Sequence, residues 1–157
     1  IISHHDALPI SGHDVFIITD KITLDSIDIT GDGKVTIFVN NGSGSFVPNS
    51  NGTEFGRVDQ EEKLEIYVDT ISGVQNNNFH VTFRNNSLTR GYFMFENARV
   101  RFNQNSTLKG AIYTGAVNGS VEAVKLLQNA NISEDEGRAL IVAPNGKVRM
   151  EKYGKQF

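Results

Sequence analysis

The sequence lacks the residues that build several common kinds of site. It contains no cysteine, which excludes a disulfide framework, a thiol nucleophile and a thiolate zinc site. It has no tryptophan and only three prolines in 157 residues. No apolar run approaches the roughly 20 residues of a membrane-spanning helix. The 15 basic and 18 acidic residues form no block of one sign, which argues against a nucleic-acid-binding surface.

Glycine, asparagine and phenylalanine are abundant instead. There are 15 glycines, and phenylalanine outnumbers tyrosine 10 to 4. Asparagines occur side by side at 40–41, 76–78 and 85–86. Because asparagine and glycine tolerate left-handed backbone angles, this composition is typical of tight turns between short strands.

Five segments alternate between apolar and other residues with a period of two, which predicts β-strands. Glycine or asparagine separates nearly all of them. The sequence therefore predicts an all-β fold. The segments are Val35–Val39, Leu64–Val68, Phe79–Phe83, Val100–Phe102 and Val148–Met150.

One stretch of the chain occurs twice. Phe83–Gly91 is echoed by Phe102–Gly110, and the closing glycines lie 19 residues apart (110 − 91). A period near 20 residues predicts a chain that coils and stacks on itself. We therefore predict a right-handed parallel β-helix, a solenoid in which asparagines at equivalent turns form a hydrogen-bonded ladder. The alternative is a β-sandwich, in which the strands pair antiparallel and the repeat is accidental.

A third, looser copy follows. Gln128–Ile132 resembles Gln104–Leu108, and Arg138–Ala143 resembles Lys109–Thr114. An acidic insert, Ser133–Gly137, separates the two halves of this copy. The alignment predicts that the insert bulges out between two paired segments.

Residues 120–128 admit two readings. In the repeat alignment Val124–Leu127 is a strand. Read alone, Ser120 is a helix N-cap before good helix formers, which predicts a short capping helix. We favour the strand and keep the helix as the alternative.

The length fits one domain, which buries roughly two thirds of its unfolded surface. We expect this domain to have an irregular N-terminal part and a loop insert between stacked strands. The expected parts are a single domain over 1–157, an irregular lead-in at 1–23, stacked strands over 24–150, a loop insert at 40–57 and a tail at 151–157.

Three segments follow one another in a familiar order: Ile27–Val39, Leu64–Val68 and Asn105–Tyr113. They resemble the β-helical C-terminal domain of bacterial PilX-like pilus-assembly and pilin-like proteins, over residues 24–150. The chain departs from that family at Asn118–Glu136, where a short glycine-rich turn of the helix is expected.

The resemblance implies an extracytoplasmic module on or near the bacterial cell envelope. The apolar N-terminal helix of the family is absent from this sequence, whose start without methionine suggests a processed piece. Any membrane attachment would thus come through a segment outside this chain. The resemblance implies no catalytic residues.

Two segments resemble metal sites, but we predict no metal. Asp28–Gly33 partly matches a calcium loop, yet Val39 stands at the twelfth position, where a bidentate acid is required. We interpret Asp32-Gly33 as a structural corner between strands. The other candidates lie in the expected lead-in: His4, His5, Asp6, His13 and Asp14.

No motif predicts catalysis. Glu61-Glu62 and Glu134–Glu136 lie in polar stretches without a matched acid and base for glycoside cleavage. Asn41–Ser45 comes near a serine nucleophile motif, but its spacing is wrong. We therefore predict a protein that is not an enzyme and needs no cofactor.

Four aromatic residues are the predicted binding residues. Phe46 and Phe55 lie in the long loop insert. Tyr67 and Tyr113 are surface candidates because a tyrosine hydroxyl tolerates water, and they would stack on sugar rings. The aromatic run Tyr92–Phe95 is interpreted as core filling.

These observations predict a non-catalytic structural or adhesive module of a pilus-like or cell-envelope protein, located outside the cell. Its partners would be proteins of a surface assembly or a cell-surface ligand, carbohydrate included, and not nucleic acid. The alternative is a carbohydrate-binding or polysaccharide-active β-helix domain.

Overall fold

The computed structural model describes residues 13–20, 32–40, 52, 63–69, 79–115, 122–132, 141–144 and 146–149, and the strand backbone at 2–4, 22–24, 54–55, 133 and 150. In these residues the regular secondary structure is β-strand and no α-helix occurs. The described part therefore holds no helix of the length and apolarity that crossing a membrane requires. The prediction of an all-β fold is confirmed.

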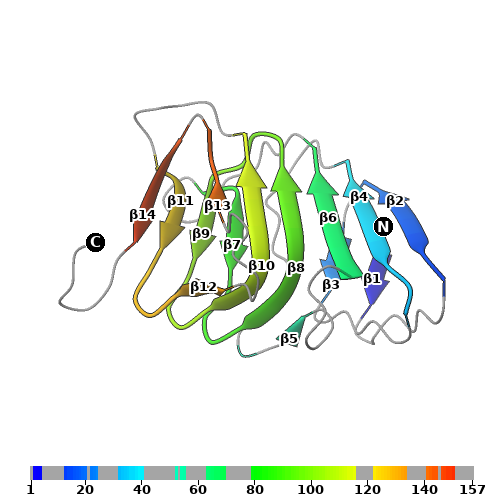
Figure 1. Cartoon of the computed structure of the whole chain (residues 1–157), viewed down its shortest axis with the longest axis horizontal. Coiled ribbons are helices and arrows are strands. Elements are labelled where there is room, and N and C mark those ends of the chain that lie inside the picture. Colours follow the sequence, from blue (N-terminus) through cyan, green and yellow to red (C-terminus); the bar gives the residue numbers. More distant parts are fainter. Residues whose placement is uncertain are drawn as a thin grey trace.

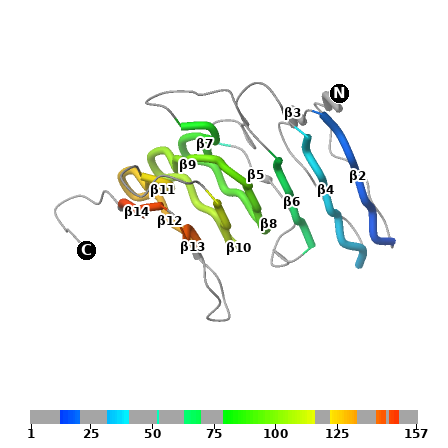
Figure 2. The backbone as a smooth tube through the Cα atoms, turned by 90° about the horizontal axis from the view of Figure 1, so that it is seen from above, coloured from blue at the N-terminus to red at the C-terminus, as the bar shows by residue number. Residues whose placement is uncertain are grey.

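The largest sheet has eight strands, of which six follow one another in the order β12-β10-β8-β6-β4-β2, while β13 pairs with β10 and β5 with β8 (Figure 1). Figure 2 shows β2, β4, β6, β8 and β10 side by side along the long axis of the molecule. The strands are β2 (Val15–Thr19), β4 (Val35–Val39), β5 (Glu54–Phe55), β6 (Leu64–Val68), β8 (Leu88–Phe95), β10 (Thr107–Thr114), β12 (Asn131–Ser133) and β13 (Ile141–Val142).

A four-stranded sheet in the order β14-β11-β9-β7 and a two-stranded pair complete the described strands. All pairings between described strands are parallel, so the antiparallel pairing of a β-sandwich is not found there. The strands are β7 (Val81–Phe83), β9 (Val100–Phe102), β11 (Glu122–Leu126) and β14 (Lys147–Met150), with β1 (Ile2–His4) paired to β3 (Ile22–Leu24).

Residues that the sequence repeat aligns lie opposite each other in the sheet. β8 and β10 pair over eight positions, and Gly91 lies opposite Gly110. The third copy is also in register, because Ile132 lies opposite Leu108 and Ile141 opposite Ile112. The predicted alignment is thus confirmed for the first two copies and, in the third, for Asn131–Ile132 and Ile141–Val142. The predicted boundary of the insert is wrong at Ser133, because Ser133 pairs with Lys109, the position expected for Arg138; residues 134–140 lie outside the described residues.

The turns of the three copies are stacked through asparagines. Asn86, Asn105 and Asn129 adopt φ of 55°, 55° and 57°, the left-handed region that asparagine tolerates. The Asn105 Nδ2 donates to Asn86 Oδ1 at 3.0 Å, and the Asn129 Nδ2 donates to Asn105 Oδ1 at 3.1 Å. The predicted asparagine ladder is confirmed.

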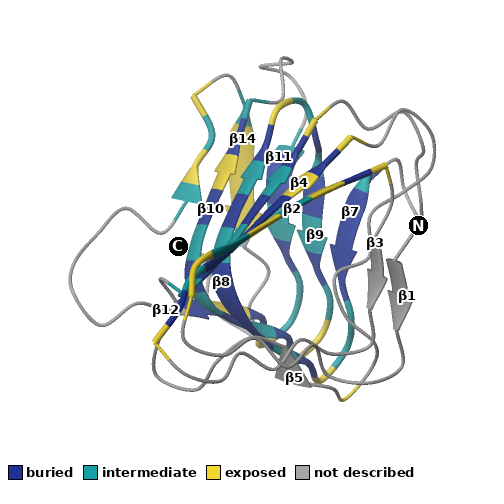
Figure 3. Cartoon of the chain, turned by 90° about the vertical axis from the view of Figure 1, so that its right-hand side faces the viewer, coloured by how far each residue is buried: buried dark blue, intermediate teal, exposed yellow. Residues whose placement is uncertain are grey.

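The hydrophobic core lies between the eight-stranded and four-stranded sheets. Phe83 of β7 stacks on Phe102 of β9, with ring centroids 4.4 Å apart, and meets Phe93 of β8 edge-on at 5.4 Å. All three side chains are buried. Figure 3 shows buried positions on β7, β8 and β9, and exposed positions alternating with intermediate ones on β2 at the near end.

Three expectations are corrected. Residues 1–23 are not an irregular lead-in, because β2 pairs with β4 along its whole length. The capping helix at 120–128 is wrong, because Ala123, Val124 and Leu126 are buried in strand β11, and this packing outweighs helix propensity. The loop insert at 40–57 contains a strand, β5, whose residues pair with β8.

Candidate functional site: an apolar groove on the outer face of the large sheet

One row of side chains crosses the outer face of the eight-stranded sheet. Along β4 the buried Ile37 alternates with the outward Phe38, and the same alternation repeats on each neighbouring strand. Because the strands pair in parallel register, these outward residues lie side by side on neighbouring strands. We call this set the outer row: Ile18, Phe38, Tyr67, Met94, Tyr113 and Val142.

The outer row is exposed to an unusual degree for apolar side chains. Ile18 is 82% exposed, and Phe38 and Tyr113 are 41% and 42% exposed. The row forms the floor of an open groove of about 700 Å³ that extends from Ile18 to Tyr113. A contiguous exposed apolar surface of this kind is the usual mark of an interaction site.

The middle of the groove holds an aromatic pair. The rings of Phe38 and Tyr67 are 5.0 Å apart at 17°. The Tyr67 hydroxyl donates to Glu65 Oε2 at 3.4 Å, and Glu65 also pairs with Lys34. Burial, followed by the negative charge of Glu65, raises the pKa of Tyr67, so its hydroxyl stays protonated and able to donate at neutral pH.

One flank of the groove carries side-chain oxygens. Asn40, Asp69 and Glu96 directly follow β4, β6 and β8. The backbone N–H of each donates to the last carbonyl of the neighbouring strand, which is β2, β4 and β6 respectively, at 2.8, 3.0 and 3.2 Å. A hydrogen bond that the protonated Glu96 carboxyl donates to Asp69, reinforced by the negative charge of Asp69, raises the pKa of Glu96. No lysine or arginine of the described chain lines the groove. The groove is therefore apolar on its floor and acidic on this flank.

The structure brings together two of the four predicted binding residues. Tyr67 and Tyr113 both line the groove. The backbone of Phe55 belongs to β5 opposite Thr89, but its side chain lies outside the described residues, as does all of Phe46. The interpretation of the run 92–95 as core holds for Phe93 and Phe95, which are buried.

The sequence reading missed Ile18, Phe38 and Met94 in the floor and Asp69 and Glu96 in the flank. A signal was present in the repeat itself. Once the strands are aligned on their buried residues, each outward apolar residue falls at the same position of its strand. Alignment of all strands, rather than the two best copies, would have exposed the row.

The residues considered for metal binding have other contacts where the structure describes them. Asp14 Oδ1 accepts the backbone N–H of Lys34 at 2.9 Å, and Val39 is buried in the core. A Cβ on Gly33 would lie 2.1 Å from the His13 carbonyl oxygen, which supports its structural role at a corner. The described ranges contain no group of three or more metal-ligating side chains; His4, His5, Asp6 and 28–31 lie outside them or lack described side chains.

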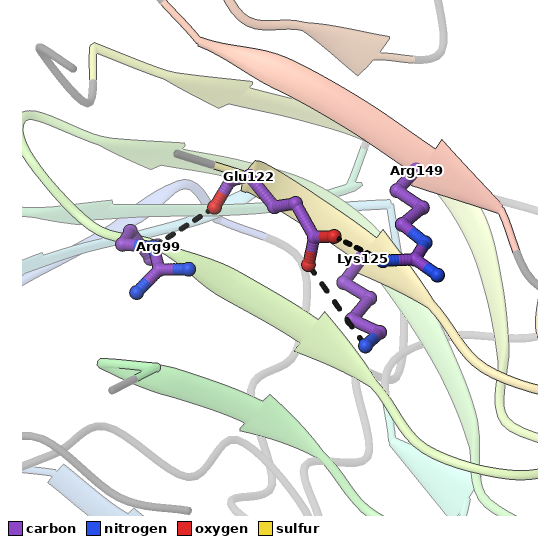
Figure 4. A network of polar contacts seen from close by, with 4 residues as sticks. All are labelled: Arg99, Glu122, Lys125 and Arg149. Atoms are coloured by element: carbon purple, nitrogen blue, oxygen red, sulfur yellow. Dashed lines mark hydrogen bonds and ion pairs between the residues drawn. The ribbon is translucent and has the colours of Figure 1, made fainter. Parts of the chain in front are cut away.

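A second polar cluster lies on the four-stranded sheet (Figure 4). Glu122 of β11 pairs with Arg149 of β14 at 2.9 Å and with Lys125 at 3.9 Å. The Glu122 carbonyl accepts the Arg99 Nε at 2.9 Å, and the Arg99 guanidinium lies 4.6 Å from the ring centre of Phe79. These contacts join neighbouring strands, so we assign the cluster a structural role.

The groove is thus the best candidate site that the described residues provide. It combines an exposed apolar floor with a hydrogen-bonding flank on a rigid stacked sheet. Comparisons of the chain with protein-family models, with curated proteins and with solved structures found no match.

Proposed function

We propose that this chain is a non-catalytic structural or adhesive module of a cell-envelope protein, exposed outside the cell and built as a right-handed parallel β-helix. The observation that carries the binding role is the outer row, which exposes apolar side chains across six strands in one register. A fold that only needed stability would place polar residues there.

The order of the strands supports the β-helix. From β7 to β11 the chain passes alternately through the four-stranded and the eight-stranded sheet, and each pass pairs with the previous one in parallel. A chain that coils around one core visits its faces in this order. A crystal structure with a left-handed path or with antiparallel neighbours would overturn this architecture.

The groove supports binding rather than cleavage. Glycoside hydrolysis uses two carboxyl groups about 5 to 9.5 Å apart. Asp69 and Glu96 instead follow the paired residues Val68 and Phe95 of neighbouring strands, so both stand on the same flank of the groove. Such a pair offers hydrogen-bond partners to a ligand along one edge rather than an acid and a base on opposite sides of a sugar ring.

The test is binding of the labelled protein to bacterial cells and to isolated envelopes. Phe38→Ser and Tyr113→Ser should each weaken binding roughly 10-fold, because they remove apolar contact from the groove. Phe16→Ser is the matched control, since Phe16 is also an exposed aromatic residue of the sheet but does not line the groove. Equal binding by all four proteins would dismiss the proposed function.

The second candidate function is that of a polysaccharide-active enzyme. It is favoured by one observation, the adjacent carboxyl groups of Asp69 and Glu96 on the flank of the groove, where the negative charge of Asp69 raises the pKa of Glu96 in the direction that a general acid requires. Release of reducing ends from a glycan, abolished in Glu96→Gln, would establish it. Binding without release of reducing ends supports the adhesive module.

A further inference from the structure

We propose that the groove binds an uncharged pyranose polysaccharide, with the sugar chain lying along the outer row and crossing the strands. This inference rests on the proposed function of the groove as a binding surface and names the chemical class of its ligand.

The shape of the groove suits an extended polymer. Neighbouring strands lie about 4.8 Å apart, so the floor from β2 to β10 extends for about 19 Å. Its five side chains point outward at the same level, from Ile18 to Tyr113. A straight, shallow groove of this length fits several consecutive sugar rings, whereas a small ligand would leave most of the apolar floor exposed.

The chemistry of the groove matches the two faces of a sugar ring. A pyranose presents C–H groups from its ring faces and hydroxyls from its edge. The C–H groups would pack on Phe38, Tyr67 and Tyr113, because aromatic side chains provide rigid apolar area. The hydroxyls would donate to Asn40, Asp69 and Glu96 along the flank. At the ends of β4, β6 and β8 each flank residue stands two positions after the floor residue of the same strand. A single sugar chain therefore contacts the floor and the flank together.

The charges select an uncharged glycan. The groove presents Asp69 and Glu96 and no basic residue of the described chain, so it repels uronate and sulfate groups. On the other sheet Arg101, Lys125 and Arg149 form a separate basic row.

The experiment measures binding of soluble hexasaccharides by isothermal titration calorimetry. The probes are cellohexaose and laminarihexaose as uncharged chains and hexagalacturonate as the anionic chain. We expect saturable binding of at least one uncharged probe with Kd below about 1 mM. Since no ligand charge is involved, this Kd should change less than about twofold between 50 and 500 mM salt. Hexagalacturonate should not bind.

Two variants test the two parts of the groove. Tyr67→Ser should weaken binding at least about 10-fold through loss of the floor, and Asp69→Ala about 5-fold through loss of a hydrogen-bond acceptor. Phe16→Ser should bind like the unaltered protein. Thermal unfolding of each variant checks that it is folded.

The outcomes separate this inference from the proposed function. If the groove variants lose binding to cells but no uncharged probe binds, the module is adhesive and the ligand class is wrong. Preference for hexagalacturonate also overturns the inference, as does loss of cell binding after protease but not glycosidase treatment of the cells. If the groove variants bind cells normally, the proposed function itself fails.

Discussion

Both faces of the eight-stranded sheet carry apolar side chains that alternate along each strand, but one face is buried and the other is exposed. On β4 Ile37 is fully buried, whereas its neighbour Phe38 is 41% exposed. On β8 the buried Phe93 alternates with the outward Met94. On β8 the difference arises because the four-stranded sheet lies against the inner face, where Phe83 of β7 meets Phe93 edge-on, while the outer face lines the groove. Hydrophobicity along a strand thus identifies candidates for burial, and the second layer decides which of them are buried.

The stacking that positions both faces depends on Gly110. It has φ of +134°, and a Cβ there would lie 2.1 Å from the carbonyl oxygen of Gly91 on the neighbouring strand. Gly110→Ala should therefore lower the free energy of unfolding by about 5 kcal/mol, since backbone strain and a clash with main chain add together. Urea-induced unfolding followed by circular dichroism measures the loss.

Gly52 provides the matched control for Gly110. It also has a positive φ, of +71°, but no described residue lies within 4 Å of its Cβ position. Gly52→Ala should cost only about 1 kcal/mol, from backbone strain alone. Similar costs at both positions would show that close stacking at Gly110 does not hold the sheet together.

Neighbouring residues of β8 test the two faces directly. Phe93→Ala should cost about 4 kcal/mol, because it leaves a cavity between the two sheets. Met94→Ala should cost under about 1 kcal/mol, because Met94 belongs to the outer row and contacts solvent. The same unfolding measurement applies to both. A large cost for Met94→Ala would mean that the outer row is part of the core rather than a binding surface.

Much of the fold can be predicted from the sequence, because residues at equivalent positions of the repeat pair with each other in the sheet. The pairing of Gly91 with Gly110, the asparagine ladder and the strand at 124–126 all follow from aligning the copies. Strand β2 was not predicted, because Val15–Thr19 is apolar at nearly every position and shows no alternation.

The site followed from the sequence only in part. Tyr67 and Tyr113 were identified as surface residues because their hydroxyls tolerate water. Phe38 has no polar atom to mark it as a surface residue, and it lies in the groove because no described residue covers it. The flank was hidden because Asp69 and Glu96 meet through strand pairing, 27 residues apart in sequence (96 − 69).

Substitutions in the asparagine ladder, which belongs to neither face of the sheet, should change the free energy of unfolding less. Asn105 donates to Asn86 and accepts from Asn129 at a φ of 55°. Asn105→Ala should cost about 2 kcal/mol, because it loses both hydrogen bonds and strains the backbone. Asn105→Gly keeps the backbone relaxed and should cost about 1 kcal/mol. Equal costs would show that the hydrogen bonds, rather than backbone strain, account for the loss.

The smallest predicted effect is a pH dependence at the start of the covering sheet. His80 Nδ1 accepts the backbone N–H of Arg99 at 2.9 Å. Burial, followed by the positive charge of Arg99, lowers the pKa of His80 below its ordinary value near 6.5. Between the two pKa values the unfolded chain binds more protons than the folded chain. Stability is therefore complete above about pH 6.5 and is lost as the pH falls through the folded pKa.

His80→Asn removes this titration and offers an amide oxygen to the Arg99 N–H. Unfolding free energies measured at steps from pH 8 to 5 should fall less steeply in this variant than in the unaltered protein. An unchanged slope in His80→Asn would mean that the edge of the covering sheet is open to water at His80, and that the inner face is less sealed there than at Phe93.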